Sequence, residues 1–168
     1  MTLAFYQLFP PELPIIGNKK TFFVYKIKKA IQLECLKHQQ KILFNHGHIG
    51  DNIMEAVAPK LHTIREDKTD RWKPGNDIHF VINDQTKNRE QFLPPVKCIS
   101  TQKIEIKYLK DMLSGNLFPI VMIDNFDIED RILKLLAIND GFTTVDEFFA
   151  YFNTDFTGKL IHWTPLKY

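Results

Sequence analysis

The chain has 168 residues, of which 44% are hydrophobic and 25% are charged, and its formal net charge is +2. This length suits one domain with an appended element, and the composition excludes a disordered or fibrous chain. No apolar run approaches the roughly 20 residues that span a bilayer, and prolines interrupt the first 14 residues before a signal peptide could form. We therefore expect a cytoplasmic protein with no membrane partner.

The cysteines and the charges are unevenly placed along the chain. Cys35 and Cys98 fall in different predicted elements and form no Cys-x-x-Cys pair, so we expect two buried free thiols. Basic residues gather at 19–29 and again at 60–73, whereas acidic residues gather at 124–155. Each basic group is either a solvated surface or a contact for a negatively charged partner.

The first third of the chain predicts an arm, a helix and a strand. Residues 1–20 are rich in proline and resemble an arm that packs across a domain. Residues 22–40 carry an apolar stripe at helical spacing, which predicts a helix. Residues 41–45 form a strand candidate, the Gly- and His-bearing stretch 46–51 a loop, and a short helical turn should end before Pro59.

The middle of the chain reads as strands and turns. A strand is predicted at 62–65, and the Lys-Pro-Gly-Asn sequence at 73–76 predicts a turn. Residues 77–83 alternate in polarity like a half-buried strand, and 84–90 form a loop or hairpin end. The β-rich stretch 96–108 is either one long bent strand or two strands joined at a bulge.

The last third predicts two strands and two helices. Residues 119–124 and 159–164 are apolar strands, and 130–138 has helical apolar spacing. A second helix begins at Thr144, whose hydroxyl can cap it while Glu147 reaches back. Because short helices interrupt the strands without a βαβ rhythm, the chain predicts an α+β fold. A small closed or nearly closed barrel with helices at its ends fits this order best.

Four segments are similar to ASCH (activating signal cointegrator homology) domains. The heptapeptide Pro-Lys-Leu-His-Thr-Ile-Arg at 59–65 resembles the lysine-threonine-isoleucine-arginine signature of that family. The segment at 72–77 resembles its glycine-aspartate turn, and 136–142 its acidic residue followed by Gly-Phe. The closing segment 158–163 resembles its final strand.

This resemblance implies a fold, a domain division and a ligand class. The fold would be a PUA-like small β-barrel of the ASCH type with flanking helices. It would occupy residues 41–168, and residues 1–40 would be an N-terminal arm and helix packed on it. The family's proposed partners are RNA and modified nucleosides, which it binds or processes. One bacterial branch is an amidohydrolase that deacetylates N4-acetylcytidine.

The resemblance also implies a catalytic set. In the amidohydrolase branch it consists of a lysine, a threonine and a glutamate, which fall here on Lys60, Thr63 and Asp140. The aspartate is one methylene shorter than the family's glutamate. Thr63 would be the nucleophile, a desolvated Lys60 its base, and Asp140 would exchange a proton with the leaving group. In a regular strand Lys60 and Thr63 would point to opposite sides, so catalysis requires a turn or bulge after Pro59.

A binding role requires less, because only Lys60 and Arg65 need to face solvent. Basic side chains would meet phosphates while Trp72 stacks on a base, although Trp72 could instead fold back over the end of the barrel. The sequence therefore ranks RNA or nucleotide binding first, and an ASCH-type amidohydrolase or ribonuclease second. The predicted ligand-binding residues are Lys60, His62, Thr63, Arg65, Arg71, Trp72 and Lys73.

The sequence leaves two further possibilities, a metal site and a role in binding another protein. The sequence His46-Gly47-His48 with Asp51 could hold a metal, but no other ligand of recognised spacing completes such a site. Phosphate-binding glycine loops and dinucleotide fingerprints are absent from the sequence. We therefore expect no metal and no cofactor. A third hypothesis is a protein-interaction module in which residues 1–40 grip a partner.

Overall fold

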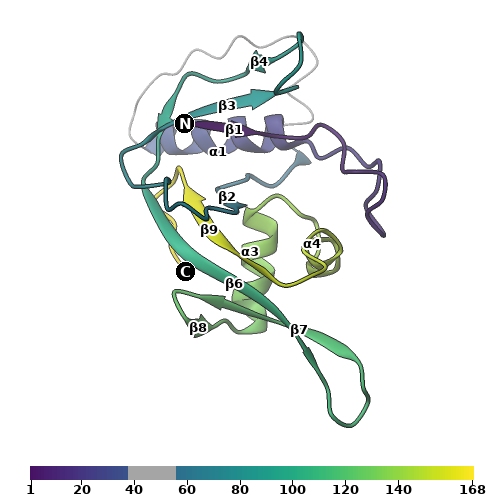
Figure 1. Ribbon diagram of the computed structural model, residues 1–168. Helices are drawn as coiled ribbons and strands as arrows, with labels where there is room; N and C mark the ends of the chain where they lie inside the picture. The colour runs from purple at the N-terminus through teal and green to yellow at the C-terminus, as the bar shows by residue number, and fades with distance from the viewer. Residues whose placement is uncertain (38–55) are drawn as a thin grey trace.

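The computed structural model describes residues 1–37 and 56–168. The predicted strand 41–45 and the loop 46–51, with its two histidines, lie outside the described residues. Within the described residues the fold is α+β, as the sequence predicts, and consists of two sheets and three helices (Figure 1).

The smaller sheet is built around strand β3. This strand pairs in parallel with β1 and antiparallel with β4 and β5. Helix α1 lies along this sheet (Figure 1) and buries Ile27, Ala30 and Ile31, the apolar stripe of the predicted helix. The bounds of these elements are β1 Thr2–Ala4, α1 Phe23–Lys37, β3 Asp77–Ile82, β4 Glu90–Gln91 and β5 Val96–Lys97.

The larger sheet has five antiparallel strands in the order β2-β9-β6-β7-β8. No pairing joins β2 to β8 within the described residues, so the predicted closure of a barrel is not found there. Part of the open edge of β2 is taken by a side chain, because the Ile64 amide donates to the Asp140 carboxylate at 3.2 Å. The strands are β2 His62–Arg65, β6 Ser100–Lys110, β7 Leu117–Ile123, β8 Phe126–Asp127 and β9 Phe156–His162.

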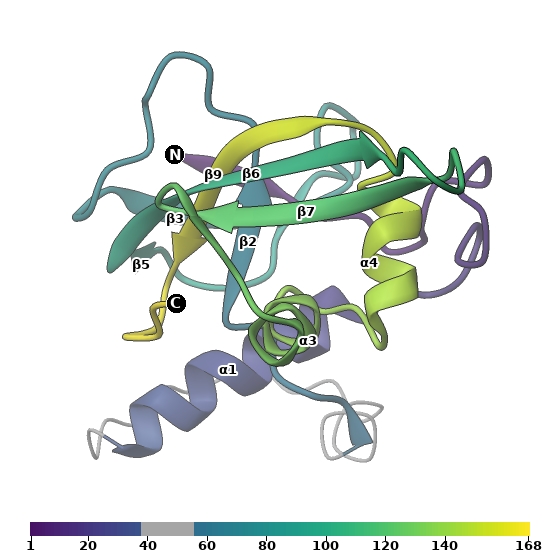
Figure 2. The same cartoon turned by 90° about the horizontal axis from the view of Figure 1, so that it is seen from below.

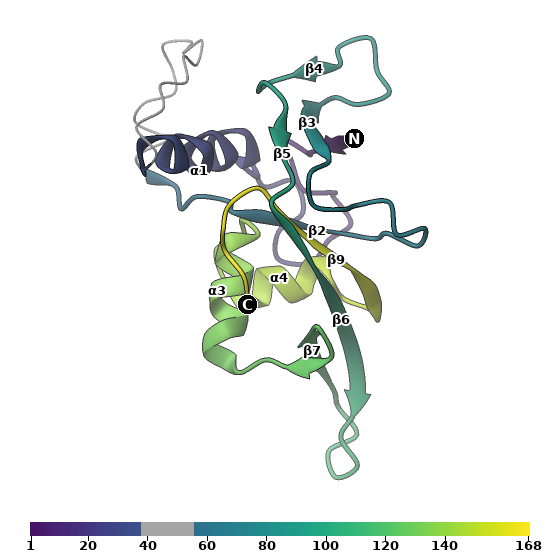
Figure 3. The same cartoon turned by 90° about the vertical axis from the view of Figure 1, so that its left-hand side faces the viewer.

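The stretch predicted as one bent strand or two is two strands, and it carries the chain from one sheet to the other. The Cys98 amide donates to Asn76 beside the smaller sheet, and the Ile99 amide donates to His162 of the larger sheet. Figure 3 shows β5 leading through this point into β6. The second of the two alternatives is therefore the one observed.

Helices α3 (Asp130–Asn139) and α4 (Val145–Tyr151) pack against the larger sheet (Figure 2). Thr144 caps α4 as predicted, since its hydroxyl accepts from the Glu147 amide at 3.1 Å. The Glu147 carboxylate bonds the Thr143 amide, one residue before the cap. No helix of residues 1–37 and 56–168 is long and apolar enough to cross a membrane.

The N-terminal arm belongs to both hydrophobic cores. Leu3 and Phe5 are buried with α1 and β3, and Phe9 and Ile16 are buried with α3 and α4. Phe23 contacts both clusters. Figures 1 and 2 agree that the arm runs beside α4. Four side chains of the arm therefore belong to the interior, whereas Tyr6, Leu8 and Ile15 are exposed.

Candidate functional site

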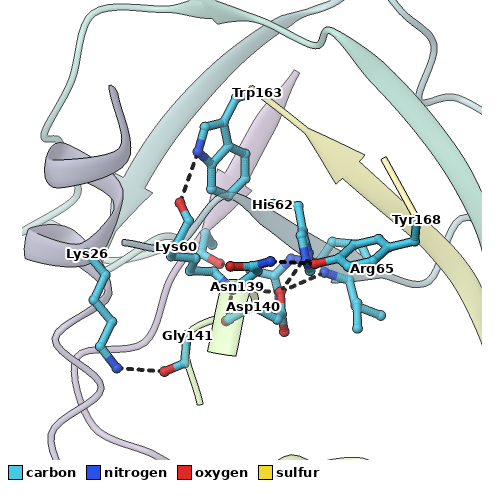
Figure 4. A network of polar contacts seen from close by, with 11 residues as sticks. Lys26, Lys60, His62, Arg65, Asn139, Asp140, Gly141, Trp163 and Tyr168 are labelled. Carbon is cyan, nitrogen blue, oxygen red and sulfur yellow. Dashed lines mark hydrogen bonds and ion pairs between the residues drawn. The ribbon is translucent and has the colours of Figure 1, made fainter. Parts of the chain in front are cut away.

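A buried ion pair joins the approach to β2 with the end of α3. Lys60 and Asp140 are 1% and 4% exposed, and the Lys60 ammonium donates to Asp140 Oδ1 at 2.7 Å (Figure 4). The same ammonium also donates to the Asp140 carbonyl. Burying a charge is costly unless it is paired and hydrogen-bonded. Each member of this pair therefore requires the other.

Lys60 lies before the first residue of β2 rather than in the strand. Its amide donates to the carbonyl of Lys26 on α1 at 3.0 Å, and its carbonyl accepts from the Trp163 indole at 3.1 Å. The next amide, that of Leu61, donates to the carbonyl of Asn139 on α3 at 2.8 Å. Lys60 and Leu61 therefore lie outside β2, and their backbone amides bond to α1 and α3.

The end of α3 holds Asp140 through a Schellman motif. Asp140 is the C-cap residue, and Gly141 follows with φ +97°. The Phe142 amide donates to Ala137 at 3.0 Å and the Gly141 amide to Ile138 at 2.9 Å, which is the bonding pattern of that motif. The Asp-Gly-Phe sequence thus fixes the position of the carboxylate while Phe142 enters the core.

Gly141 also leaves the space that Lys60 occupies. A Cβ atom at this position would lie 2.8 Å from the Phe23 ring and 3.2 Å from Lys60 Cδ. The Gly141 carbonyl accepts from Lys26 Nζ at 2.6 Å, so Lys26 of α1 is a second lysine beside Gly141 (Figure 4). Any residue with a side chain at position 141 would be strained and would crowd the ion pair.

The predicted catalytic residues line one small cavity at the open edge of β2. Lys60, Thr63 and Asp140 all contribute to its wall, although Thr63 points to the opposite face of the strand from His62. The cavity measures about 20 Å³, which is space for roughly one water molecule. All three side chains therefore border the same small space, and all three are buried.

The environment of Lys60 changes its acid–base behaviour. Burial lowers the pKa of Lys60 to about 8, although the Asp140 carboxylate acts in the opposite direction. The Lys60 ammonium also lies 4.8 Å from the centroid of the Phe23 ring. With a pKa in this range, a useful fraction of Lys60 is a neutral amine near neutral pH, which is what a general base needs.

Asp140 remains ionised in spite of its burial. Burial by itself would raise the pKa of this carboxyl, but the attraction of Lys60 and the contact with His62 outweigh it and hold the pKa below its usual value. The carboxylate accepts from Lys60 Nζ and from the Ile64 amide through the same oxygen. Its role in the resting site is that of a fixed negative charge.

A chain of polar contacts leads from α3 to the Asp140 carboxylate (Figure 4). The side-chain amide of Asn139 donates to Tyr168 Oη at 2.9 Å, and that oxygen lies 2.8 Å from His62 Nε2. The Tyr168 hydroxyl then donates to His62 Nε2, which places the single proton of the neutral His62 ring on Nδ1, 3.5 Å from Asp140 Oδ1. Burial lowers the pKa of His62, so the ring is neutral.

His62 belongs to a row of polar residues across the sheet. His162 is its partner on β9, and Ser100 is the partner of His162 on β6. Both His162 nitrogens, the Ser100 hydroxyl and His62 Nδ1 are buried without a hydrogen-bond partner in residues 1–37 and 56–168. Burial, together with His62 and Lys167, lowers the pKa of His162 to about 3. The row is therefore uncharged at neutral pH.

Four residues of the predicted binding set are buried, namely Lys60, His62, Thr63 and Trp72. Of the two alternatives for Trp72 the inward one is observed, because its side chain is 5% exposed and packs in the core with α1 and β3. The expected exposure of Lys60 is wrong, because the ammonium is held by Asp140. The Asp67 carboxylate accepts from the amides of Arg71 and Trp72, which turns the indole inward.

The remaining basic residues of that set have different surroundings. Arg65 donates to the carbonyl of Ala4 at 2.7 Å and lies over the Phe5 ring, so it fastens the arm to β2. Arg71 and Lys73 are exposed, and Lys73 is paired with Asp70. Arg71 and Lys73 therefore lie on a surface loop, apart from the cavity that Lys60 lines.

Sequence reasoning missed Tyr168 and Asn139, and it treated His162 as an ordinary structural histidine. Tyr168 and His62 are separated by 106 positions, and no spacing rule connects them. A polar side chain directly after a predicted helix was the one available signal for Asn139. Among the described residues, no group of three or more His, Cys, Asp or Glu side chains could hold a metal ion.

A wider cleft of about 310 Å³ adjoins the small cavity, and the two share Tyr6, Tyr151 and Phe152. The cleft is open and its walls are mainly aromatic. It provides the room for a ligand that the small cavity lacks.

Comparison with protein-family models, with curated proteins and with solved structures finds no match to this chain.

Proposed function

We propose that this protein is an ASCH-type hydrolase that cleaves the amide bond of a small acylated nucleoside. One observation carries the proposal: a buried lysine with a pKa of about 8 shares a cavity with a threonine and an ionised aspartate. A buried lysine whose pKa is lowered by its surroundings is a recognised mark of a functional site. The nucleoside is suggested by the family resemblance at 59–65 and 136–142.

The residues supply the parts of an acyl transfer. Neutral Lys60 takes the proton of the Thr63 hydroxyl as Thr63 Oγ1 bonds to the carbonyl carbon of the amide. The C–N bond then breaks, and the Lys60 ammonium returns the proton to the leaving amine. Water attacks the acyl-Thr63 ester in the same way, which releases the acid and restores the hydroxyl. Asp140 keeps Lys60 in place and stabilises its ammonium form between the two proton transfers.

This proposal is tested with N4-acetylcytidine and the separation of cytidine from it by chromatography. We expect turnover, with a rate that rises with pH and levels off above about 8, where Lys60 is mostly neutral. Thr63→Val should abolish turnover because it removes the hydroxyl with little change in shape. Thr63→Ser is the matched control and should retain activity.

Two results would contradict the proposal. One is the absence of cytidine when enzyme and substrate are present in equal amounts. The other is equal activity of Thr63→Val and Thr63→Ser. Thermal unfolding of each variant should be measured alongside, so that a loss of activity is not confused with a loss of fold.

A second candidate is the binding of single-stranded RNA or a nucleotide. The observation in its favour is the surface loop at 66–73, where Lys68, Arg71 and Lys73 are exposed. Affinity for a short RNA should fall steeply with salt, because phosphate contacts release counterions. Replacing Arg71 and Lys73 by alanine should weaken binding and flatten that salt dependence, whereas Lys110→Ala on a distant hairpin should not. Unchanged binding in the double variant would exclude this surface.

A further inference from the structure

The cleft beside the small cavity is formed by two parts of the chain that lie far apart in the sequence. One wall comes from the N-terminal arm, and the other comes from α4 and the segment leading into β9. The six apolar or aromatic side chains that matter for the argument are Tyr6, Pro10, Leu13, Tyr151, Phe152 and Phe156. The sequence analysis placed the arm outside the family resemblance, so the resemblance does not account for this wall.

The arm is held firmly at the point where Tyr6 projects. The guanidinium of Arg65 donates to the Ala4 carbonyl at 2.7 Å, two residues before Tyr6. The Thr21 hydroxyl donates to the Tyr6 carbonyl at 2.6 Å, and Thr21 is itself buried. The backbone at Tyr6 is therefore fixed on both sides, although the side chain is 60% exposed.

Tyr6 stands where the cleft meets the catalytic cavity. It lines both, as do Tyr151 and Phe152, whereas Lys60 and Asp140 line only the smaller one. The side chains of Tyr6, Arg65 and Asp140 are all close enough to Tyr151 to influence its ionisation. A ligand lying in the cleft would thus pass over Tyr6 and Tyr151 before its reactive group reached Lys60.

We propose that residues 6–13 of the arm form one wall of a subsite for a flat aromatic ring, and that Tyr6 is its specificity-determining residue. This inference rests on the proposed function, because it assigns the ring of the substrate to the cleft and the amide carbonyl to the mouth of the cavity. Aromatic walls favour a flat π-face, and stacking of a base on an aromatic side chain contributes substantially to binding.

The chemistry of the cleft restricts the ligand further. None of the side chains that line it is charged. A phosphate group placed there would lose its water without gaining a cation, which is unfavourable. The subsite therefore selects an uncharged ring, as in a free nucleoside or base, over the phosphorylated backbone of an RNA strand.

The test compares Tyr6→Ala, Tyr6→Phe and Leu8→Ala with the unmodified chain. Leu8 lies on the same arm and is exposed, but it lines a different cavity, so it controls for general effects on the arm. For hydrolysis of N4-acetylcytidine we expect Tyr6→Ala to raise KM about tenfold and to leave kcat within about twofold. Tyr6→Phe, which keeps the ring, and Leu8→Ala should stay within about threefold of the unmodified KM.

Binding of plain cytidine, which has no amide to cleave, separates this inference from the proposed function. Calorimetric titration of the Thr63→Val variant should detect cytidine, and adding Tyr6→Ala should weaken that binding about tenfold. Binding that depends on Tyr6 without any turnover would overturn the hydrolase and support the subsite. Turnover with an unchanged KM in Tyr6→Ala would overturn the subsite and leave the hydrolase standing. Neither binding nor turnover would overturn both.

Discussion

Two lysine–aspartate contacts in this molecule differ chiefly in their access to water. Lys60 and Asp140 are buried between β2 and α3, whereas Lys73 and Lys159 meet an exposed Asp70 on the surface loop. Burial lowers the pKa of Lys60 to about 8, and the hydrogen bonds from the two lysines lower the pKa of Asp70 to about 2. The surface contact only makes its charges more permanent, whereas at the buried contact the loss of water outweighs the attraction of Asp140 and lowers the pKa of Lys60.

The largest expected effect comes from removing one member of each contact. Asp140→Ala leaves a buried ammonium without its partner and should lower the free energy of unfolding by about 3–5 kcal/mol. Asp70→Ala, the matched surface variant, should stay close to the unmodified chain because solvent replaces the lost partner. Urea titration followed by circular dichroism measures both.

A double variant sharpens this comparison. Lys60→Met combined with Asp140→Ala removes both charges and should recover much of the stability lost in Asp140→Ala alone. If Asp140→Ala and Asp70→Ala prove equally mild, burial does not govern the Lys60 contact. The assignment of Lys60 as a perturbed base would then fail with it.

The second prediction concerns pH. The unfolded chain protonates His162 near its usual pKa of 6.5, whereas the folded chain resists protonation until the pH approaches 3. Stability is therefore complete above pH 6.5 and is lost as the pH falls. At about 1.4 kcal/mol per unit, the loss by pH 4 should be roughly 3 kcal/mol. His62, whose pKa is also lowered, acts in the same direction.

The variant His162→Phe should flatten this pH dependence, and urea titrations between pH 7 and 4 would show it. The surface contact affects stability in a lower pH range, because the contribution of Asp70 is lost only as the pH falls toward its lowered pKa of about 2. A loss of stability that begins only below pH 4 would therefore assign the effect to exposed carboxylates and contradict the prediction.

The third prediction compares two glycines, one beside each contact. Gly141 adjoins the buried pair and Gly75 lies in the turn that follows the surface loop, and both have positive φ. Gly141→Ala adds a clash with Phe23 to the backbone strain and should cost about 3 kcal/mol. Gly75→Ala meets no atom within 4 Å and should cost only about 1 kcal/mol from strain. Equal losses would mean that the space behind Gly141 adjusts freely.

The fold was largely predictable because its signals are local. Alternating polarity located β3, and the Lys-Pro-Gly-Asn turn was predicted where Gly75 has positive φ. A closed or nearly closed barrel was predicted and closure is not found in the described residues, because the order of the elements along the chain says nothing of what covers an edge. Here the Asp140 carboxylate bonds the Ile64 amide at that edge.

The site was only half predictable, for a physical reason. The resemblance brought Lys60, Thr63 and Asp140 together, and the structure places all three around one cavity. The solvent exposure of Trp72 and Lys60 was misjudged, because charged neighbours in the sequence were taken as a sign of contact with solvent. Trp72 stands between Arg71 and Lys73 but is buried, because the backbone amides of Arg71 and Trp72 donate to the Asp67 carboxylate and shape the loop.

The smallest predicted effect lies at the outer end of the buried network. Tyr168→Phe removes the hydroxyl between Asn139 and His62 and leaves both buried groups without that partner, which should cost about 1–2 kcal/mol. It should also shift the pH dependence of hydrolysis, because the ring proton of His62 is then no longer directed toward Asp140. The matched variant is Tyr25→Phe on α1, which should change neither quantity. If the two variants behave alike, the Lys60–Asp140 contact does not depend on the hydrogen bonds of Tyr168. Burial of the Lys60–Asp140 pair would then by itself account for its difference from the Asp70 contacts on the surface loop.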